Sequence, residues 1–149
     1  MSRTDLRVDL DRHWEFGGVD PADALGDLEV SPGQWAAAGE LRVPALDLGG
    51  VDHVVLTGMG GSGISSDIVA ELGAARLPVP LIVHKGYGLP AYVGERSLLV
   101  AVSCSGDTEE TRLAAETALD RGARLFAVAR GGRLSELCHE RGLPWVRIA

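Results

Sequence analysis

From residue 51 onward, the chain alternates short apolar runs with longer amphipathic stretches. The apolar runs are rich in valine, leucine, isoleucine and alanine and cover residues 51–56, 79–83, 97–102, 124–129 and 145–148. Runs that are apolar at almost every position are typical of strands buried on both faces of a parallel sheet. Helical stretches separate several of them, at 62–75, 108–121 and 133–141. The pattern predicts an α/β fold of three layers, in which helices flank a five-stranded parallel sheet of flavodoxin-like or Rossmann-like type.

The N-terminal part of the chain has a weaker pattern, which predicts only short helices. One helix is predicted over residues 4–16, where Leu6, Leu10 and Trp14 recur at helical spacing. A second is predicted over 34–39, with Ser31 as its N-cap and Pro32 in its first turn.

Length and composition are those of one globular domain, with 149 residues of which 46% are hydrophobic. Within it we distinguish an N-terminal helical segment, 1–45, from a sheet-forming domain, 46–149. The formal net charge of −7 argues against nucleic acid or an anionic membrane as partner. The N-terminus has no apolar signal segment, and no apolar run approaches the roughly 20 residues of a membrane span.

The cysteine and histidine content predicts the cellular compartment and the absence of a metal site. Cys104 and Cys138 do not form a CxxC pair, and no His/Cys/Asp cluster has metal-ligand spacing. We therefore expect a cytoplasmic protein with neither a metal nor a cofactor.

The first predicted strand runs into a glycine-rich turn, GMGGSG at 58–63. A strand, a loop of nearly bare backbone and a helix N-terminus together favour a phosphate ligand. Gly58, Gly60 and Gly63 fit the dinucleotide fingerprint literally, but that fingerprint also needs an acidic residue after the next strand. Lys85 stands there instead, so an NADP-binding domain is an alternative. Another alternative is that these glycines only allow a tight turn.

The third predicted strand runs into a loop that carries three hydroxyl groups around Gly106, at Ser103, Ser105 and Thr108. Hydroxyl donors beside a helix N-terminus suit the dispersed oxygens of a monophosphate. Asp107 and Glu110 have the spacing of a capping box for the helix at 108–121. The alternative is that all these polar groups serve as caps.

The two loops together, GMGGSGISSD followed by VSCSGDTEET, resemble the sugar isomerase (SIS) domain, most of all the N-terminal half of the bifunctional phosphoglucose/phosphomannose isomerases. The resemblance covers roughly residues 50–148 and includes GGRL at 131–134. It implies isomerisation of glucose 6-phosphate or mannose 6-phosphate to fructose 6-phosphate, in a homodimer or with completion by a second SIS domain. A phosphosugar-sensing module without turnover is an alternative.

The resemblance also implies roles for individual residues. The side chains that match sugar-phosphate ligands are Ser62, Ser103, Ser105 and Thr108. Gly60 and Gly61 match the backbone that approaches the substrate, and Arg133 matches an arginine that stabilises the enediolate intermediate.

The chain departs from the family pattern in three respects. Cys104 stands where the family usually has tyrosine, and Asp107 stands where it usually has asparagine. The catalytic glutamate and the ring-opening histidine of the resembled enzymes lie further along the chain, and nothing in these 149 residues matches either one. His84 follows a predicted strand at the correct edge of the sheet, but a structural role for it is favoured.

Overall fold

The computed structural model describes residues 11–12 and 17–148. The chain divides into two units, Met1–Glu40 and Leu41–Ala149, and each is described by itself. The helix predicted over 4–16 falls almost wholly outside the described residues.

The described part of the N-terminal unit contains the short helices α1 (Ala24–Glu29) and α2 (Ser31–Gly39), neither of which has a buried residue. The Asp20 carboxylate accepts hydrogen bonds from the N–H groups that open α1, and these bonds lower the pKa of Asp20. The sequence pattern does not predict α1. The expected N-cap of α2 is wrong by one residue, because Val30 is the N-cap and Ser31 already lies in the helix.

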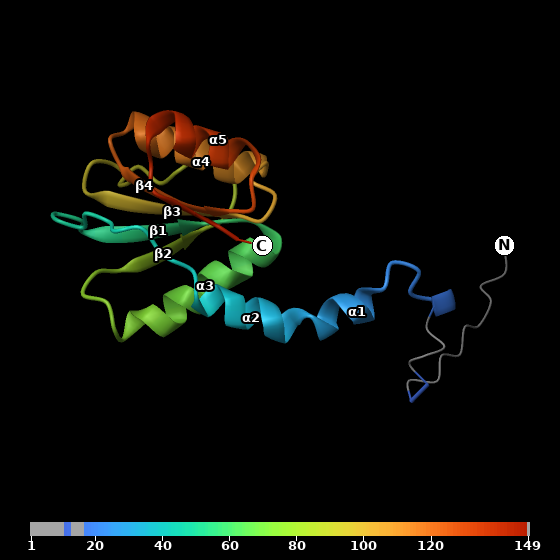
Figure 1. Cartoon of the computed structure of the whole chain (residues 1–149). Helices are drawn as coiled ribbons and strands as arrows, with labels where there is room; N and C mark the ends of the chain where they lie inside the picture. Colours follow the sequence, from blue (N-terminus) through green and yellow to red (C-terminus); the bar gives the residue numbers. More distant parts are fainter. Residues whose placement is uncertain (1–10, 13–16, 149) are drawn as a thin grey trace. The chain divides into compact units, whose positions relative to one another are not determined.

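The second unit is built on a five-stranded sheet in the order β2-β1-β3-β4-β5, with every pair of neighbours parallel. Its strands are β1 (His53–Thr57), β2 (Leu81–His84), β3 (Ser97–Ser103), β4 (Arg124–Ala129) and β5 (Trp145–Arg147). Its helices are α3 (Gly60–Ala74), α4 (Glu109–Asp120) and α5 (Gly132–Arg141). Helices α4 and α5 cover one face and α3 lies on the other (Figure 1). The predicted three-layer α/β fold is confirmed.

The predicted element boundaries of this unit lie within two residues of the observed ones, and those of β4 coincide with them. Strand β2, predicted over 79–83, begins only at Leu81. Pro78 and Pro80 explain the late start, because proline has no N–H group to donate to the ladder.

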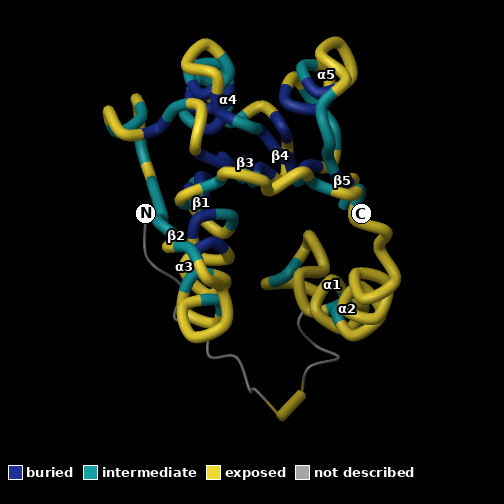
Figure 2. Tube along the Cα trace, turned by 90° about the vertical axis from the view of Figure 1, so that its left-hand side faces the viewer, coloured by how far each residue is buried: buried dark blue, intermediate teal, exposed yellow. Residues whose placement is uncertain are grey.

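The face beneath α4 and α5 holds the main core of the unit. Nine of its members have no exposed surface at all: Val55, Leu99, Ala101, Ala114, Ala115, Ala118, Ala127, Ala129 and Cys138. Small alanine side chains on both the helix and the strands let α4 approach the sheet closely. Cys138 lies in this core. Figure 2 shows that buried residues concentrate in the central strands, whereas the outer faces of the helices are exposed.

Two loops cross at the carboxyl edge of the sheet, where β3 leads to α4 and β4 leads to α5. Gly106 has φ +78°, and a Cβ there would overlap the carbonyl oxygen of Gly131. Gly132 has φ +68°, and a Cβ there would lie 2.5 Å from the carbonyl oxygen of Ser105. Only glycine combines this left-handed backbone with so close an approach. We call this contact the glycine crossing.

Hydrogen bonds hold the glycine crossing together. Arg130 N donates to Cys104 O at 3.1 Å, and Leu134 N donates to Gly106 O at 2.9 Å. Two N–H groups at the start of α5 are thus used within the protein, because Arg133 N also donates to Asp107 Oδ1 at 3.0 Å.

The predicted capping box on the helix at 108–121 is wrong. The N-cap of α4 is Thr108, and its side chain makes no capping hydrogen bond. The Asp107 carboxylate instead accepts the N–H of Arg133 at the start of α5. The glycine crossing brings the start of α5 close enough to donate a hydrogen bond to this carboxylate, whereas sequence spacing alone had predicted that Asp107 caps α4.

Replacing Gly106 with alanine tests the glycine crossing. Gly142→Ala is the matched control, because Gly142 has φ +63° but a Cβ there would meet no atom within 4 Å. The control is expected to cost about 1–2 kcal/mol from left-handed backbone strain alone. Gly106→Ala is expected to cost about 1–3 kcal/mol more, because the methyl group also displaces main chain. Urea unfolding measures both, and equal losses would mean that the loops do not need the close approach.

Candidate functional site

The candidate site lies where the sheet topology opens a crevice. Strands β1 and β3 are neighbours in the sheet, but the helices that follow them, α3 and α4, lie on opposite faces (Figure 1). Ligands of open parallel sheets bind at such a switch point, beyond the carboxyl ends of the strands. A cleft of about 740 Å³ lies there. Its lining residues are Met59, Gly61, Ser62, Ser65, Val102, Cys104, Ser105, Thr108, Arg130 and Ile148.

One wall of the cleft is the start of α3. The N-cap residue Met59 is extended and makes no side-chain capping hydrogen bond, and no other described side chain caps the first N–H groups of α3. Gly58 allows this turn, because a Cβ there would lie 2.8 Å from the carbonyl oxygen of Val102 in β3. The hydroxyl of Ser65 donates within the helix to Gly61 O at 3.0 Å. The Ser62 hydroxyl has no hydrogen-bond partner among the described residues.

The opposite wall is the loop between β3 and α4. Ser103 is 1% exposed, and its Oγ accepts the Gly106 N–H at 3.0 Å and shares a hydrogen bond of 2.9 Å with Thr108 Oγ1. Ser105 Oγ accepts the Asp107 N–H at 3.1 Å. Ser105 and Thr108 line the cleft, whereas Ser103 lies beneath them and positions Thr108. The three hydroxyls therefore shape one loop and leave α4 without a side-chain cap.

The helix N-termini around the cleft differ in what they can offer to an anion. Helices α3 and α4 both begin at the cleft without a side-chain cap. Helix α5 has its first N–H groups bound to Asp107 and Gly106. Because a helix N-terminus carries partial positive charge, the attraction for an anion is concentrated at α3 and α4.

Among the described residues that line the cleft, Arg130 is the one with a charged side chain, and sequence reasoning missed it. The sequence signal is its place directly after β4, at the ligand-binding edge of the sheet. The predicted site residue Arg133 is the second residue of α5, is exposed, and is not one of the residues that line the cleft. Gly60, another predicted site residue, is the first residue of α3. It is not one of the lining residues, but its neighbour Gly61 is.

Lys85, on which the NADP alternative depends, is already paired. Its ammonium group forms an ion pair with the Asp67 carboxylate on α3. Its stem passes over Gly63, where a Cβ would lie 3.1 Å from Lys85 Cε. Lys85 therefore braces the start of α3 and is not a lining residue of the cleft.

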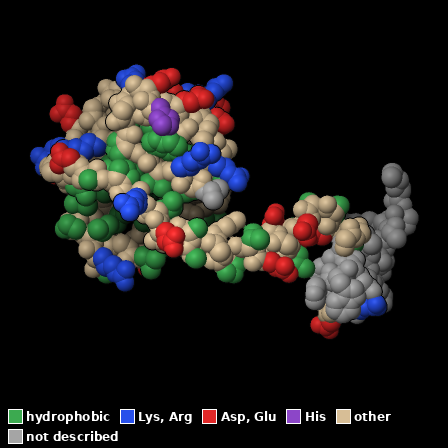
Figure 3. All heavy atoms as spheres, in the orientation of Figure 1, with side chains coloured by type: hydrophobic (Ala, Val, Ile, Leu, Met, Phe, Trp, Pro, Cys, Tyr) green, Lys and Arg blue, Asp and Glu red, His purple; other side chains and the backbone are tan. Residues whose placement is uncertain are grey.

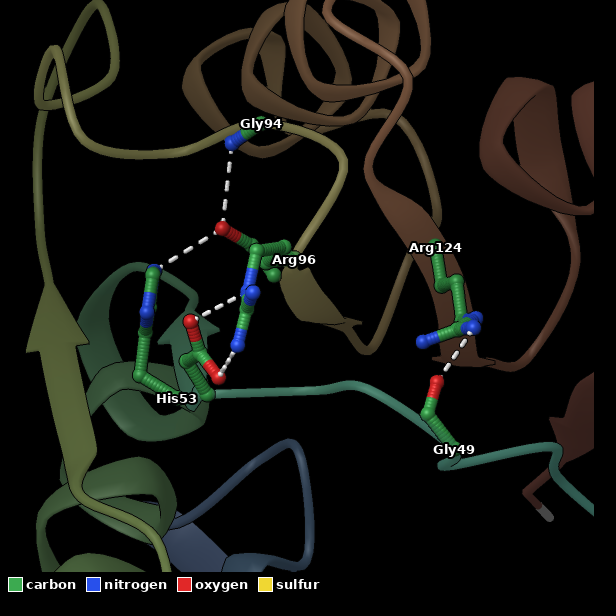
Figure 4. A network of polar contacts seen from close by, with 7 residues as sticks. Gly49, His53, Gly94, Arg96 and Arg124 are labelled. Atoms are coloured by element: carbon green, nitrogen blue, oxygen red, sulfur yellow. Dashed lines mark hydrogen bonds and ion pairs between the residues drawn. The ribbon is translucent and has the colours of Figure 1, made fainter.

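Among the described residues that line the cleft, none is a histidine, an aspartate or a glutamate. His84 Nε2 lies 2.7 Å from Gly88 O, which gives it the expected structural role in the turn after β2. His53 lies at the other edge of the sheet, in the polar network of Figure 4, with its Nε2 2.8 Å from Ser97 Oγ. His139 packs against the ring of Trp145. The cleft thus offers hydrogen-bond donors and one cation, but no evident general base.

The described residues contain no group of three or more His, Cys, Asp or Glu that could hold a metal ion. Within the same ranges, no helix combines the length and the apolar character that crossing a membrane requires. On the face shown in Figure 3, acidic and basic side chains are interspersed over the unit that contains the sheet. That face carries no large basic patch of the kind that binds nucleic acid.

Comparison with known sequences connects the chain to sugar-phosphate enzymes. It is 39% identical over 98 residues to the bifunctional phosphoglucose/phosphomannose isomerase of Caldicellulosiruptor bescii, covering 66% of this chain and 29% of the relative. It is 44% identical over 89 residues to the enzyme of the same name from Thermoplasma acidophilum, covering 60% and 28%. A D-glucosamine-6-phosphate 4-epimerase of Sulfolobus acidocaldarius is 31% identical over 98 residues, covering 65% and 30%. The chain thus spans less than a third of the length of these relatives. No family model matches it.

Solved structures show the same fold at low sequence identity. The Vibrio vulnificus NanR protein complexed with ManNAc-6P superposes with a TM-score of 0.63 at 21% identity, over 89% of this chain and 54% of that one. The sugar isomerase domain of the RpiR transcription factor from Sphaerobacter thermophilus superposes with a TM-score of 0.56 at 20% identity, over 93% and 76%. The chain described here therefore has the fold of a sugar isomerase domain and is a sequence relative of the bifunctional phosphoglucose/phosphomannose isomerases.

Proposed function

We propose that this chain is the sugar-phosphate-binding SIS domain of a phosphohexose isomerase that interconverts glucose 6-phosphate or mannose 6-phosphate with fructose 6-phosphate. One observation carries the proposal: two helices without side-chain caps, α3 and α4, begin at a single cleft that is also lined by hydroxyl groups. Together with the similarity to the named isomerases, this arrangement supports a phosphate monoester as the bound group.

In this proposal the residues divide into groups by role. Ser62, Ser105 and Thr108 donate hydrogen bonds to the phosphate, and Ser103 keeps Thr108 in position. Gly60 and Gly61 let the backbone approach the substrate. Arg133 stabilises the negative charge on the enediolate, as the matching arginine is thought to do in the resembled enzymes.

The proposed reaction needs groups that the cleft does not contain. A base must take a proton from C2 of the open-chain aldose, and a proton must then be delivered to C1 of the enediolate to give the ketose. Another group must open the sugar ring beforehand. Since no lining residue is a carboxylate or a histidine, we propose that a second SIS domain or a second copy of this chain supplies both groups. The proposal includes no metal or cofactor, and it places the reaction in the cytoplasm.

A phosphosugar-binding module without turnover is the second candidate. The absence of a carboxylate or histidine among the lining residues favours it, as does the likeness to the NanR protein, whose structure contains ManNAc-6P. The NADP-binding alternative is weaker, because the ammonium group of Lys85 is paired with Asp67.

Binding is expected to depend on the hydroxyls of the loop between β3 and α4. Glucose 6-phosphate or fructose 6-phosphate should raise the melting temperature of the wild-type chain, and the double variant Ser105→Ala/Thr108→Val should lose most of that rise. Each lost hydrogen bond to a charged group is expected to cost about 1.5–3 kcal/mol of binding. Thermal denaturation with each ligand measures this. A rise with NADPH but with no sugar phosphate would refute the proposal, and binding without turnover in a coupled assay would favour the sensing module.

The two cysteines provide an independent test of where the ligand binds. Cys104 is exposed and lines the cleft, whereas burial of Cys138 raises the pKa of its thiol to about 11. A thiol reagent at neutral pH should therefore modify one cysteine in the native chain and both after unfolding. Glucose 6-phosphate should slow the modification of Cys104, and unphosphorylated glucose at the same concentration is the control. Equal rates with and without glucose 6-phosphate would place the ligand elsewhere.

A further inference from the structure

The backbone of Arg130 is held on both sides at the edge of the cleft. Its N–H donates to Cys104 O at 3.1 Å, in the loop that carries Ser105 and Thr108. The preceding residue, Ala129, accepts the N–H of Ile148 at 3.0 Å, so the segment that follows β5 supports it from the other side. These main-chain bonds place Arg130 beside the hydroxyls proposed to bind the phosphate, independently of its side chain.

The guanidinium of Arg130 has no hydrogen bond or ion pair with any described residue. The nearest acidic groups along the loop between β3 and α4 are engaged elsewhere. Asp107 accepts the N–H of Arg133, and Glu109 accepts the hydroxyl of Tyr87 at 3.2 Å, which raises the pKa of that tyrosine. Other cations of this unit, such as Lys85 and Arg112, are in ion pairs. Arg130 is therefore a free positive charge at a cleft that already favours anions.

The glycine crossing separates Arg130 from Arg133, although only Gly131 and Gly132 stand between them. The left-handed backbone of Gly132, φ +68°, turns the chain into α5. Arg130 remains before the turn as a lining residue, and Arg133 lies beyond it in the helix. Of the two arginines, Arg130 is therefore the one that lines the cleft.

We propose that Arg130 binds the phosphate group of the sugar phosphate and makes the cleft selective for the dianionic phosphate over monoanionic esters. This inference rests on the proposed sugar-phosphate function. A guanidinium presents paired N–H donors that match two phosphate oxygens, and such charge-assisted bonds are stronger than those from hydroxyls. The neutral donors of the cleft respond less to whether the ligand carries one negative charge or two. The positive charge of Arg130 therefore distinguishes a dianionic ligand from a monoanionic one.

The test measures dissociation constants by titration calorimetry at pH 7.5 for glucose 6-phosphate and for glucose 6-sulfate, which has a similar shape but a single charge. Arg130→Gln is expected to weaken the binding of glucose 6-phosphate by about 10- to 100-fold and to weaken the binding of glucose 6-sulfate clearly less. Arg130→Lys should retain part of the affinity, because a point charge remains without the paired geometry. The wild type should bind glucose 6-phosphate more weakly at pH 5, where the phosphate is mostly monoanionic, and this difference should shrink in Arg130→Gln.

Arg147→Gln is the matched control for the loss of one charge. Arg147 pairs with Ala129 across the β4–β5 ladder, is exposed, and is not one of the lining residues. Its replacement should change the affinity by less than about twofold, as expected for an exposed charge outside the site.

The outcomes separate the role of Arg130 from the proposed function. The role of Arg130 would be overturned if Arg130→Gln and Arg147→Gln lost the same affinity for glucose 6-phosphate. It would also be overturned if Arg130→Gln lost the same affinity for both ligands. In either case the sugar-phosphate function stands. A wild-type chain that binds neither ligand would overturn both. The variants should keep the wild-type melting temperature, because the side chain of Arg130 is exposed and has no partner to lose among the described residues.

Discussion

The contact on which the site depends is the one between the main chains of the loop after β3 and the turn before α5. Neither Gly106 nor Gly132 has room for a Cβ, and both have left-handed backbone. Hydrogen bonds from Arg130 N and Leu134 N lock this contact. Several properties of the cleft follow from it: Arg130 lies at its edge, Asp107 faces α5, and α4 begins without a side-chain cap.

The same contact explains how the protein distributes its affinity for anions. Helices α3, α4 and α5 all begin at the carboxyl edge of the sheet, but α5 has its first N–H groups bound within the protein. The strand order then brings α3 and α4 to one crevice from opposite faces of the sheet. The Asp107 carboxylate, which would repel a phosphate at the start of α4, is instead bound to the backbone of α5. None of the described residues that line the cleft carries a carboxylate, so the cleft offers hydrogen-bond donors to an anion.

In the proposed function, the cleft binds the sugar phosphate but does not provide the base for the proton transfer. Hydroxyls, backbone N–H groups and Arg130 are the groups proposed to hold the phosphate, and none of the described residues that line the cleft is a histidine or a carboxylate. In the proposed function, binding of the sugar phosphate and transfer of the proton therefore depend on different groups.

Much of this molecule can be predicted from local sequence, because the determining interactions are close along the chain. Apolar runs separated by helices specify the parallel sheet, and glycines and hydroxyls directly after two strands specify the chemistry of the loops that line one cleft. The partner of Asp107 and the position of Arg130 depend instead on a contact between segments about 25 residues apart, and a pattern with helical or strand period carries no information on it. Which helix Asp107 caps and which arginine reaches the cleft emerge only when the chain is folded, since both follow from the close packing of two glycine backbones.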